Sequence, residues 1–240
     1  MNITGPFRRR IARLAGVVLA TAVVAGMGFG VSGQTGEDVD LTLVLAVDCS
    51  WSVDAGEFTL QMQGIADAVS SPEVLTAIQA GPNGRIAISV LQWSALNTQQ
   101  VVVPWMVVGD EASALQLARS IALAPRLVNE GATSITSAID AGLILQMSSP
   151  YRTSRRIIDV SGDGTNNNGG LPDAARDRAV SRGIVVNGLA IMNEVFYLDT
   201  YFENHVAGGT GSFVMKAADY TDFSIAIHRK LLREITLPTT

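Results

Sequence analysis

Short segments rich in Val, Ile and Leu alternate along this chain with segments in which apolar residues recur at helical spacing. The expected strands cover residues 41–47, 85–93, 99–105, 155–160, 184–191 and 212–216. The expected helices cover residues 57–69, 72–79, 110–122, 135–147, 171–182, 198–205 and 220–235. Strands that alternate with helices form a mostly parallel sheet with helices on both faces. The short polar link 94–98 joins two strands directly, so we expect one antiparallel edge strand. The sequence therefore predicts a doubly wound α/β fold.

The size and composition of the chain suit one globular domain. It has 240 residues, 48% of them hydrophobic, which is enough for a full core. The single cysteine, Cys49, has no partner for an internal disulfide. Its place beside the end of an apolar strand predicts a small buried side chain and not a reactive thiol.

Residues 1–33 have the layout of a secretory signal peptide. A basic start precedes an apolar stretch from Leu14 to Val31, and small residues then lead to Gln34. We predict cleavage near Gly33, a polar linker over residues 34–40, a folded domain over residues 41–237, and a periplasmic or secreted location. An uncleaved anchor helix is the alternative, because the apolar stretch is nearly long enough to span a bilayer.

The expected mature chain is acidic. Removal of residues 1–33 takes away four arginines and no acids, which leaves 13 Lys+Arg against 22 Asp+Glu and a net charge of −9. Such a domain is a poor partner for nucleic acid or for an anionic membrane surface. We therefore expect no nucleic-acid ligand, and no membrane contact beyond the N-terminal segment.

Oxygen-bearing side chains lie where expected strands end or helices begin. Asp48, Ser50 and Ser52 follow the first strand, Thr133 precedes the helix at 135, and Asp163 follows the strand 155–160. In parallel sheets, ligands bind at the carboxyl ends of the strands, so these segments are expected to meet. Carboxylates and hydroxyls are hard ligands that suit a hard divalent cation, first of all Mg²⁺. Taken singly, each segment also reads as an ordinary turn or helix cap.

The sequence lacks the motifs of several other kinds of site. After residue 33 it contains no Gly-x-Ser-x-Gly elbow, no Gly-x-Gly-x-x-Gly, no phosphate-binding Gly-Lys-Ser/Thr loop and no Cys/His cluster. The only histidines, His205 and His228, lie far along the chain from Ser50, which argues against a Ser-His-Asp hydrolase.

The ordered set Asp48-x-Ser50-x-Ser52, Thr133 after Gly131-Ala132, and Asp163-Gly164 after an apolar strand resembles a known metal site. It is similar to the metal-ion-dependent adhesion site of von Willebrand factor type A (vWA, integrin I-like) domains. The resemblance covers about residues 41–235, and residues 160–169 look like an uncharacterised, secreted bacterial branch of that family.

The resemblance implies a Rossmann-like vWA fold with a metal site. The hydroxyls of Ser50, Ser52 and Thr133 would bind the metal directly, and Asp48 and Asp163 directly or through water. The remaining coordination position would accept an acidic side chain of a partner protein. Mn²⁺ and Ca²⁺ are alternatives to Mg²⁺.

This chain departs from the family pattern at two places. Trp51 stands where a glycine is common, and Thr133-Ser134-Ile135 replaces the usual Thr-x-Thr. Ser134 therefore competes with Thr133 as a ligand. Trp51, Ser134 and Asn166 are candidate partner contacts, although Asn166 also reads as an ordinary loop residue.

The resulting hypothesis is a secreted or periplasmic, non-enzymatic protein-binding module of the adhesion type. A metal-assisted hydrolase that uses the same ion is the first alternative, but no general base is evident beyond the two aspartates. A structural vWA domain without metal is the second, and the number of suitable ligands argues against it. The sequence leaves the partner and the oligomeric state open.

Overall fold

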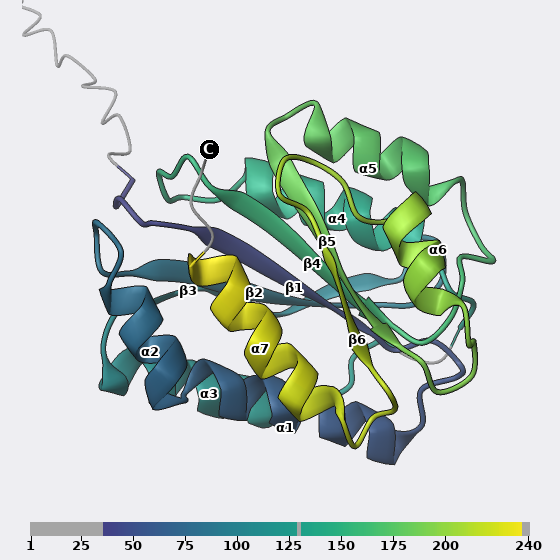
Figure 1. The fold of residues 1–240 in the computed structure, drawn as a ribbon, viewed down its shortest axis with the longest axis horizontal. Coiled ribbons are helices and arrows are strands. Elements are labelled where there is room, and N and C mark those ends of the chain that lie inside the picture. Colours follow the sequence, from purple (N-terminus) through teal and green to yellow (C-terminus); the bar gives the residue numbers. More distant parts are fainter. Residues whose placement is uncertain (1–35, 129–130, 237–240) are drawn as a thin grey trace, which may run out of the picture. The chain divides into compact units, whose positions relative to one another are not determined.

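The computed structural model describes residues 36–128 and 131–236. In that part of the chain, six strands form one sheet in the order β3-β2-β1-β4-β5-β6 (Figure 1). The strands are β1 (Thr42–Asp48), β2 (Ile86–Trp93), β3 (Gln99–Val108), β4 (Arg156–Gly162), β5 (Ile184–Ile191) and β6 (Val214–Ala217). All neighbours are parallel except β2 and β3, which are antiparallel. The predicted doubly wound sheet with one antiparallel edge strand is confirmed.

Helices cover both faces of this sheet (Figure 1). They are α1 (Ala55–Val69), α2 (Pro72–Gln79), α3 (Glu111–Ala122), α4 (Ile135–Met147), α5 (Pro172–Val180), α6 (Leu198–His205) and α7 (Phe223–Thr236). Helices α1, α2, α3 and α7 pack on one face, and α4, α5 and α6 on the other. The central strand β1 is buried along its whole length, because its alternate side chains enter the two apolar layers.

The order of the strands reverses at β1. This strand pairs with β2 on one side and with β4 on the other, so the connections leaving β1 and β4 run to opposite sides of the sheet. Doubly wound sheets form their ligand crevice at this switch point, outside the carboxyl ends of the strands. Asp48 ends β1, and Asp163 directly follows β4.

Strand β3 is longer than the sequence predicted. It continues to Val108 because its pairing with β2 extends to Ile86, with register shifts on either side of Val90. Pro104 lies within this strand. An edge strand tolerates a proline because one side of its backbone has no ladder partner.

Residues that the sequence assigned to a linker belong to the folded domain. Val39 is buried, its N–H donates to the carbonyl of Arg152 at 3.0 Å, and the N–H of Arg152 donates to the carbonyl of Glu37 at 3.0 Å. Asp38 and Arg152 add an exposed ion pair. The domain therefore begins at Glu37 or earlier, not at residue 41. Residues 34–35, the expected signal peptide and the expected end at 237 lie outside the described residues.

Among residues 36–128 and 131–236, no helix is both long and apolar enough to cross a membrane.

Candidate metal site

Asp48 places a buried carboxylate at the switch point. Its Oδ1 accepts a hydrogen bond from the backbone N–H of Ser50 at 2.7 Å. Its Oδ2 is buried and has no hydrogen-bond partner in the described part of the chain. A buried charged oxygen without a donor is costly, so it is expected to have a ligand or a proton.

Hydroxyls connect Asp48 to Asp163. The Oγ atoms of Ser50 and Ser52 lie 3.2 Å apart, and Ser52 Oγ donates to Asp163 Oδ1 at 2.6 Å. Ser50 and Asp163 are fully buried, whereas Ser52 is half-buried. The loop after β1 and the loop after β4 therefore meet through side chains that can accept a cation.

Thr133 joins the same group from the loop before α4. A side-chain carbon added at Gly164 would lie 3.6 Å from Thr133 Oγ1, so this hydroxyl lies beside the segment that follows Asp163. The backbone of Thr133 is fixed there, because its N–H donates to Asn167 Oδ1 at 2.9 Å and its carbonyl accepts from the N–H of Asn167 at 2.9 Å. The structure thus brings all five predicted ligands to one place.

Gly162 leaves room beside the free oxygen of Asp48. A carbon added at this glycine would lie 2.9 Å from Asp48 Oδ2, which is closer than side-chain atoms normally approach. Any larger residue at position 162 would therefore push against the carboxylate.

The charges of the site favour a cation. The pKa of Asp48 is raised to about 7, mainly by burial and then by the negative charge of Asp163. Among the described residues, no Lys or Arg forms an ion pair with either carboxylate. A bound cation would relieve both the burial of Asp48 and its repulsion from Asp163.

The donor set fits a hard divalent cation. It consists of two carboxylates and three hydroxyls, and the described residues contain no cluster of three or more His, Cys, Asp or Glu that could hold a metal. Three of the five ligands are hydroxyls, so this site differs from a purely acidic or Cys/His cluster. The unpartnered Oδ2 of Asp48 and the space at Gly162 are the observations on which the fit depends.

Two residues of the site were not found from the sequence. Tyr220, at the entry to α7, is buried and donates from its hydroxyl to Asp163 Oδ2 at 2.9 Å. Burial and the charge of Asp163 raise the pKa of Tyr220 well above its usual value, so the phenol stays a donor. Arg126 donates from Nη2 to the carbonyl of Cys49 at 2.9 Å and lies over the ring of Phe58. It thereby supports the backbone that carries the first ligands.

The three residues predicted to contact a partner differ in how far they are exposed to solvent. Trp51 is 77% exposed beside the ligands. Asn166 is half-buried, accepts from the N–H of Thr136 at 3.2 Å and donates to the carbonyl of Gly170 at 3.0 Å, so its amide braces its own loop. Ser134 is fully buried and donates to Ser137 Oγ at 2.8 Å. The expectation that Ser134 contacts a partner therefore disagrees with the structure, because its side chain points into the start of α4.

A sequence-family model matches residues 38–239, and its description is "Protein of unknown function (DUF1194)". The chain belongs to the DUF1194 family. No match was found among curated proteins.

Solved structures similar to this DUF1194 chain include vWA domains. One is proximal thread matrix protein 1 from the mussel byssus, in a structure described as having a zinc-occupied MIDAS (metal-ion-dependent adhesion site) motif. It has a TM-score of 0.62 at 16% identity, and the match covers 84% of this chain and 49% of that one. A von Willebrand factor type A protein from Catenulispora acidiphila has a TM-score of 0.57 at 16% identity, with 82% and 43% covered. BatB from Bacteroides thetaiotaomicron has a TM-score of 0.55 at 16% identity, with 82% and 100% covered. The DUF1194 chain has the vWA fold, and it spans about half the length of the mussel protein.

Proposed function

We propose that this DUF1194 protein is an exported, non-enzymatic binding module that takes up a divalent metal ion and captures an acidic group of a partner protein. The observation that carries the proposal is Asp48 Oδ2, a buried carboxylate oxygen without a hydrogen bond, beside hydroxyls from the loop after β1 and from the loop before α4. The zinc-occupied MIDAS motif named for the similar mussel structure supports a divalent ion at this position. The export signal is proposed from the layout of residues 1–33.

Each residue has a role in this proposal. Ser50, Ser52 and Thr133 offer neutral hydroxyl oxygens, and Asp48 and Asp163 offer carboxylates. The three neutral hydroxyls would do little to quench the charge of a divalent ion, so a bound ion would still attract a further carboxylate. Mg²⁺ is the proposed ion because all five side chains are hard oxygen ligands, and Mn²⁺ and Ca²⁺ are the alternatives.

Nothing favours the hydrolase alternative. His205 Nδ1 lies 3.0 Å from Asp173 Oδ2, and His228 Nε2 lies 3.1 Å from Ser71 Oγ, so both rings have partners away from the five ligands. A general base must reach the proton that it removes. We therefore propose binding and not turnover.

Metal uptake is tested by thermal unfolding of the purified protein with Mg²⁺, Mn²⁺, Ca²⁺ or chelator. A metal that binds the native state raises the midpoint temperature of unfolding, and the rise grows with the metal concentration. Asp48→Ala removes this rise, whereas Asp67→Ala, which removes an exposed carboxylate on α1, keeps it. No rise in the wild type, or an equal rise in Asp48→Ala, contradicts the metal site.

Capture of an acid is tested with two peptides that differ only in a central aspartate or asparagine. The aspartate peptide should bind in Mg²⁺ and be released by chelator, and the asparagine peptide should not bind. Hydrolysis of phosphate or carboxylic esters by wild type, absent in Asp48→Ala, would contradict the non-enzymatic assignment.

A further inference from the structure

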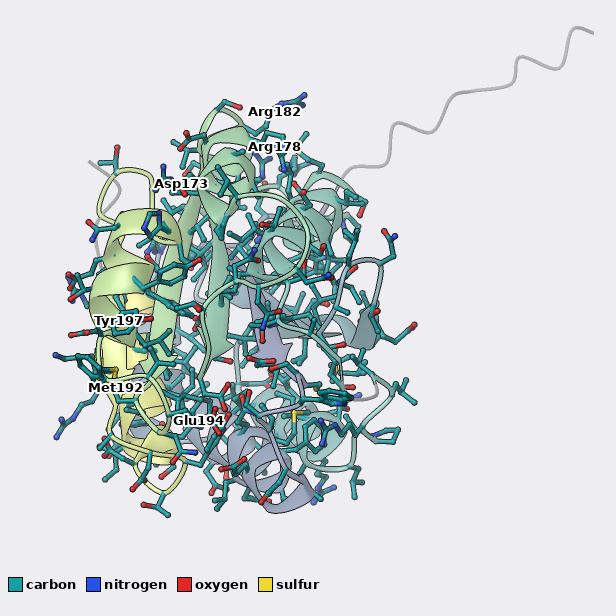
Figure 2. The ribbon with its side chains drawn as sticks, turned by 90° about the vertical axis from the view of Figure 1, so that its right-hand side faces the viewer. Asp173, Arg178, Arg182, Met192, Glu194 and Tyr197 are labelled. Atoms are coloured by element: carbon teal, nitrogen blue, oxygen red, sulfur yellow. The ribbon has the colours of Figure 1, made fainter. Side chains whose placement is uncertain are left out.

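A cavity of about 420 Å³ lies at the end of the domain opposite the proposed metal site. It is bounded by the first residues of β4 and β5, the loop 209–211 and the last turn of α7. Figure 2 shows the two ends of β5 well apart, because Arg182 precedes this strand whereas Met192 and Glu194 follow it. The cavity adjoins the start of β5, and the proposed metal ligands lie beyond the carboxyl ends of the parallel strands.

The sheet leaves this space because β6 is short. Strand β6 pairs with β5 only from Gly188 onward, and before that point the described residues on this side offer a single bridge, between Val186 and Gly208. Ile157, Val180 and Val185 give the cavity apolar walls. Small-molecule sites are mostly apolar cavities of about 300–1,000 Å³ in which a few polar groups orient the ligand. The size and the walls of this cavity fit that description.

Glu234 brings a buried carboxylate to the cavity. It is fully buried, and it lines the cavity together with Asn187. Its Oε1 accepts from Asn187 Nδ2 at 2.8 Å and from Lys230 Nζ at 2.6 Å, whereas its Oε2 has no hydrogen-bond partner among the described residues. A buried carboxylate oxygen without a donor is costly, so Oε2 is expected to meet a proton or the donor group of a ligand.

The charges behind Glu234 favour a cationic donor. Lys230 Nζ also lies 2.6 Å from Asp159 Oδ1, so one ammonium group serves two carboxylates. Neither Lys230 nor Asp159 belongs to the lining of the cavity, and Glu234 is the one acid that does. Hydrogen bonds to a carboxylate are strongest when the donor carries a positive charge. An ammonium group is therefore the donor that fits Oε2 best.

Two arginines add positive charge to the same lining, Arg155 and Arg156. Arg155 donates to the carbonyls of Glu234 and Ile235, and its guanidinium has further N–H groups. Arg156 is half-buried and forms no ion pair within the described ranges 36–128 and 131–236. These guanidinium groups would repel a simple cation, but they would bind the anionic end of a ligand that carries both charges.

We infer that this cavity binds a small zwitterion with an apolar side chain, the chemical class of an apolar α-amino acid. The ammonium group of the ligand donates to Oε2 of Glu234, and its carboxylate binds to Arg155. Its side chain packs on Ile157, Val180 and Val185. None of the five proposed metal ligands takes part, so this site is separate from the metal function.

The test uses the purified full chain and three small probes. They are phenylalanine, phenethylamine, which lacks the carboxylate, and 3-phenylpropionate, which lacks the ammonium group. Binding is measured by ligand-observed NMR in chelator, so that metal does not contribute. Phenylalanine should bind about tenfold or more tightly than either analogue, because each lost charge-assisted hydrogen bond weakens binding on that order. No binding of phenylalanine, or equal binding of the three probes, overturns the inference.

Three variants assign the binding to this cavity. Glu234→Gln keeps the size of the side chain and leaves Lys230 paired with Asp159, and it should lose both phenylalanine and phenethylamine. Arg155→Gln should weaken phenylalanine about tenfold and leave phenethylamine unchanged. Val185→Phe fills the cavity without altering a charge, and it should weaken all binding.

Arg182→Gln is the matched control. Arg182 is exposed beside Gly183, but it does not belong to the lining of the cavity, so this variant should bind phenylalanine as the wild type does. Thermal midpoints show that each variant is folded, and Val185→Phe decides the question even if Glu234→Gln does not fold. Wild-type affinity for phenylalanine in either folded variant, or an equal loss in Arg182→Gln, overturns the inference.

Discussion

The hydroxyl of Tyr220 donates a hydrogen bond to Oδ2 of Asp163 at 2.9 Å, while Ser52 Oγ donates to the other oxygen, Oδ1, at 2.6 Å. Each oxygen of this carboxylate therefore has its own donor, and the plane of the group is fixed. Asp48 differs, because its Oδ2 has no donor in the described residues. The two aspartates therefore have different roles: Asp163 is held in place by its donors, whereas Asp48 keeps one oxygen free for a cation.

Tyr220→Phe removes this donor and keeps the ring. Partners that orient metal ligands are worth about 10- to 100-fold in metal affinity, so we expect a weakening of that order. Calorimetric titration with Mn²⁺ or Mg²⁺ measures it. The control is Tyr151→Phe, at the opposite end of the sheet before β4, which should leave metal affinity unchanged. Equal affinities for Tyr220→Phe and wild type would contradict a positioning role.

Gly162→Ala tests the space beside Asp48. Its new methyl group would lie 2.9 Å from Asp48 Oδ2, so the carboxylate must shift and metal affinity should fall about tenfold or more. Gly164→Ala is the matched control, because its methyl group meets Thr133 Oγ1 at an ordinary 3.6 Å. Thermal unfolding is measured with and without Mg²⁺. The rise of the unfolding midpoint caused by Mg²⁺ should be smaller than in the wild type for Gly162→Ala and nearly equal to it for Gly164→Ala.

The fold was predictable because its signals are local. Val, Ile and Leu segments mark the strands, and helical spacing marks the helices between them. The meeting of Asp48, Thr133 and Asp163 was predictable as well, because parallel strands end at one edge. The start of α1 has such a local signal as well, because Asp54 caps this helix in a capping box with Glu57.

The remaining features depend on contacts between distant residues. Tyr220 and Asp163 are 57 positions apart, and nothing in the sequence near Tyr220 indicates its acceptor. Ser134 and Thr133 are adjacent, so sequence spacing did not show which hydroxyl faces the site and which turns into α4. Val39 is held by the backbone of Arg152, which carries no sequence signal.

Cys49 should be inert in the native protein. Its side chain is fully buried, and burial together with the charge of Asp48 raises the pKa of the thiol to about 12. Because the thiolate is the reactive form, a thiol reagent at about pH 8 should label the protein only after unfolding. Mass spectrometry with and without denaturant checks this. Rapid labelling of the native protein would show that the loop after β1 opens.

A second group of buried charges lies between the sheet and α7. Lys230 Nζ lies 2.6 Å from Asp159 Oδ1 and 2.6 Å from Glu234 Oε1, and all three residues are almost fully buried. Asn187 Nδ2 donates to the same Glu234 oxygen at 2.8 Å. One ammonium group therefore serves two carboxylates.

Lys230→Met should strongly destabilise the domain. It leaves two buried carboxylates without their cation, and breaking a buried ion pair from one side costs about 3–5 kcal/mol. Urea unfolding followed by circular dichroism measures the loss. A variant that also carries Asp159→Asn and Glu234→Gln should recover part of this stability, because no buried charge is then left unpaired. An unchanged free energy of unfolding in Lys230→Met would show that the cluster contributes nothing.

Asp159 should also make the stability of the domain depend on pH. Burial raises its pKa from 3.8 to about 7, Glu234 adds to the rise, and Lys230 opposes it. The folded state therefore holds a proton that the unfolded state has lost between about pH 4 and pH 7, so this group's contribution to stability falls as the pH rises through that window. Urea unfolding across the window, in chelator so that metal binding does not contribute, compares wild type with Asp159→Asn. The variant should lose less stability as the pH rises, because an amide does not titrate. Parallel pH profiles for the two proteins would show that Asp159 keeps the same charge in the folded and unfolded states.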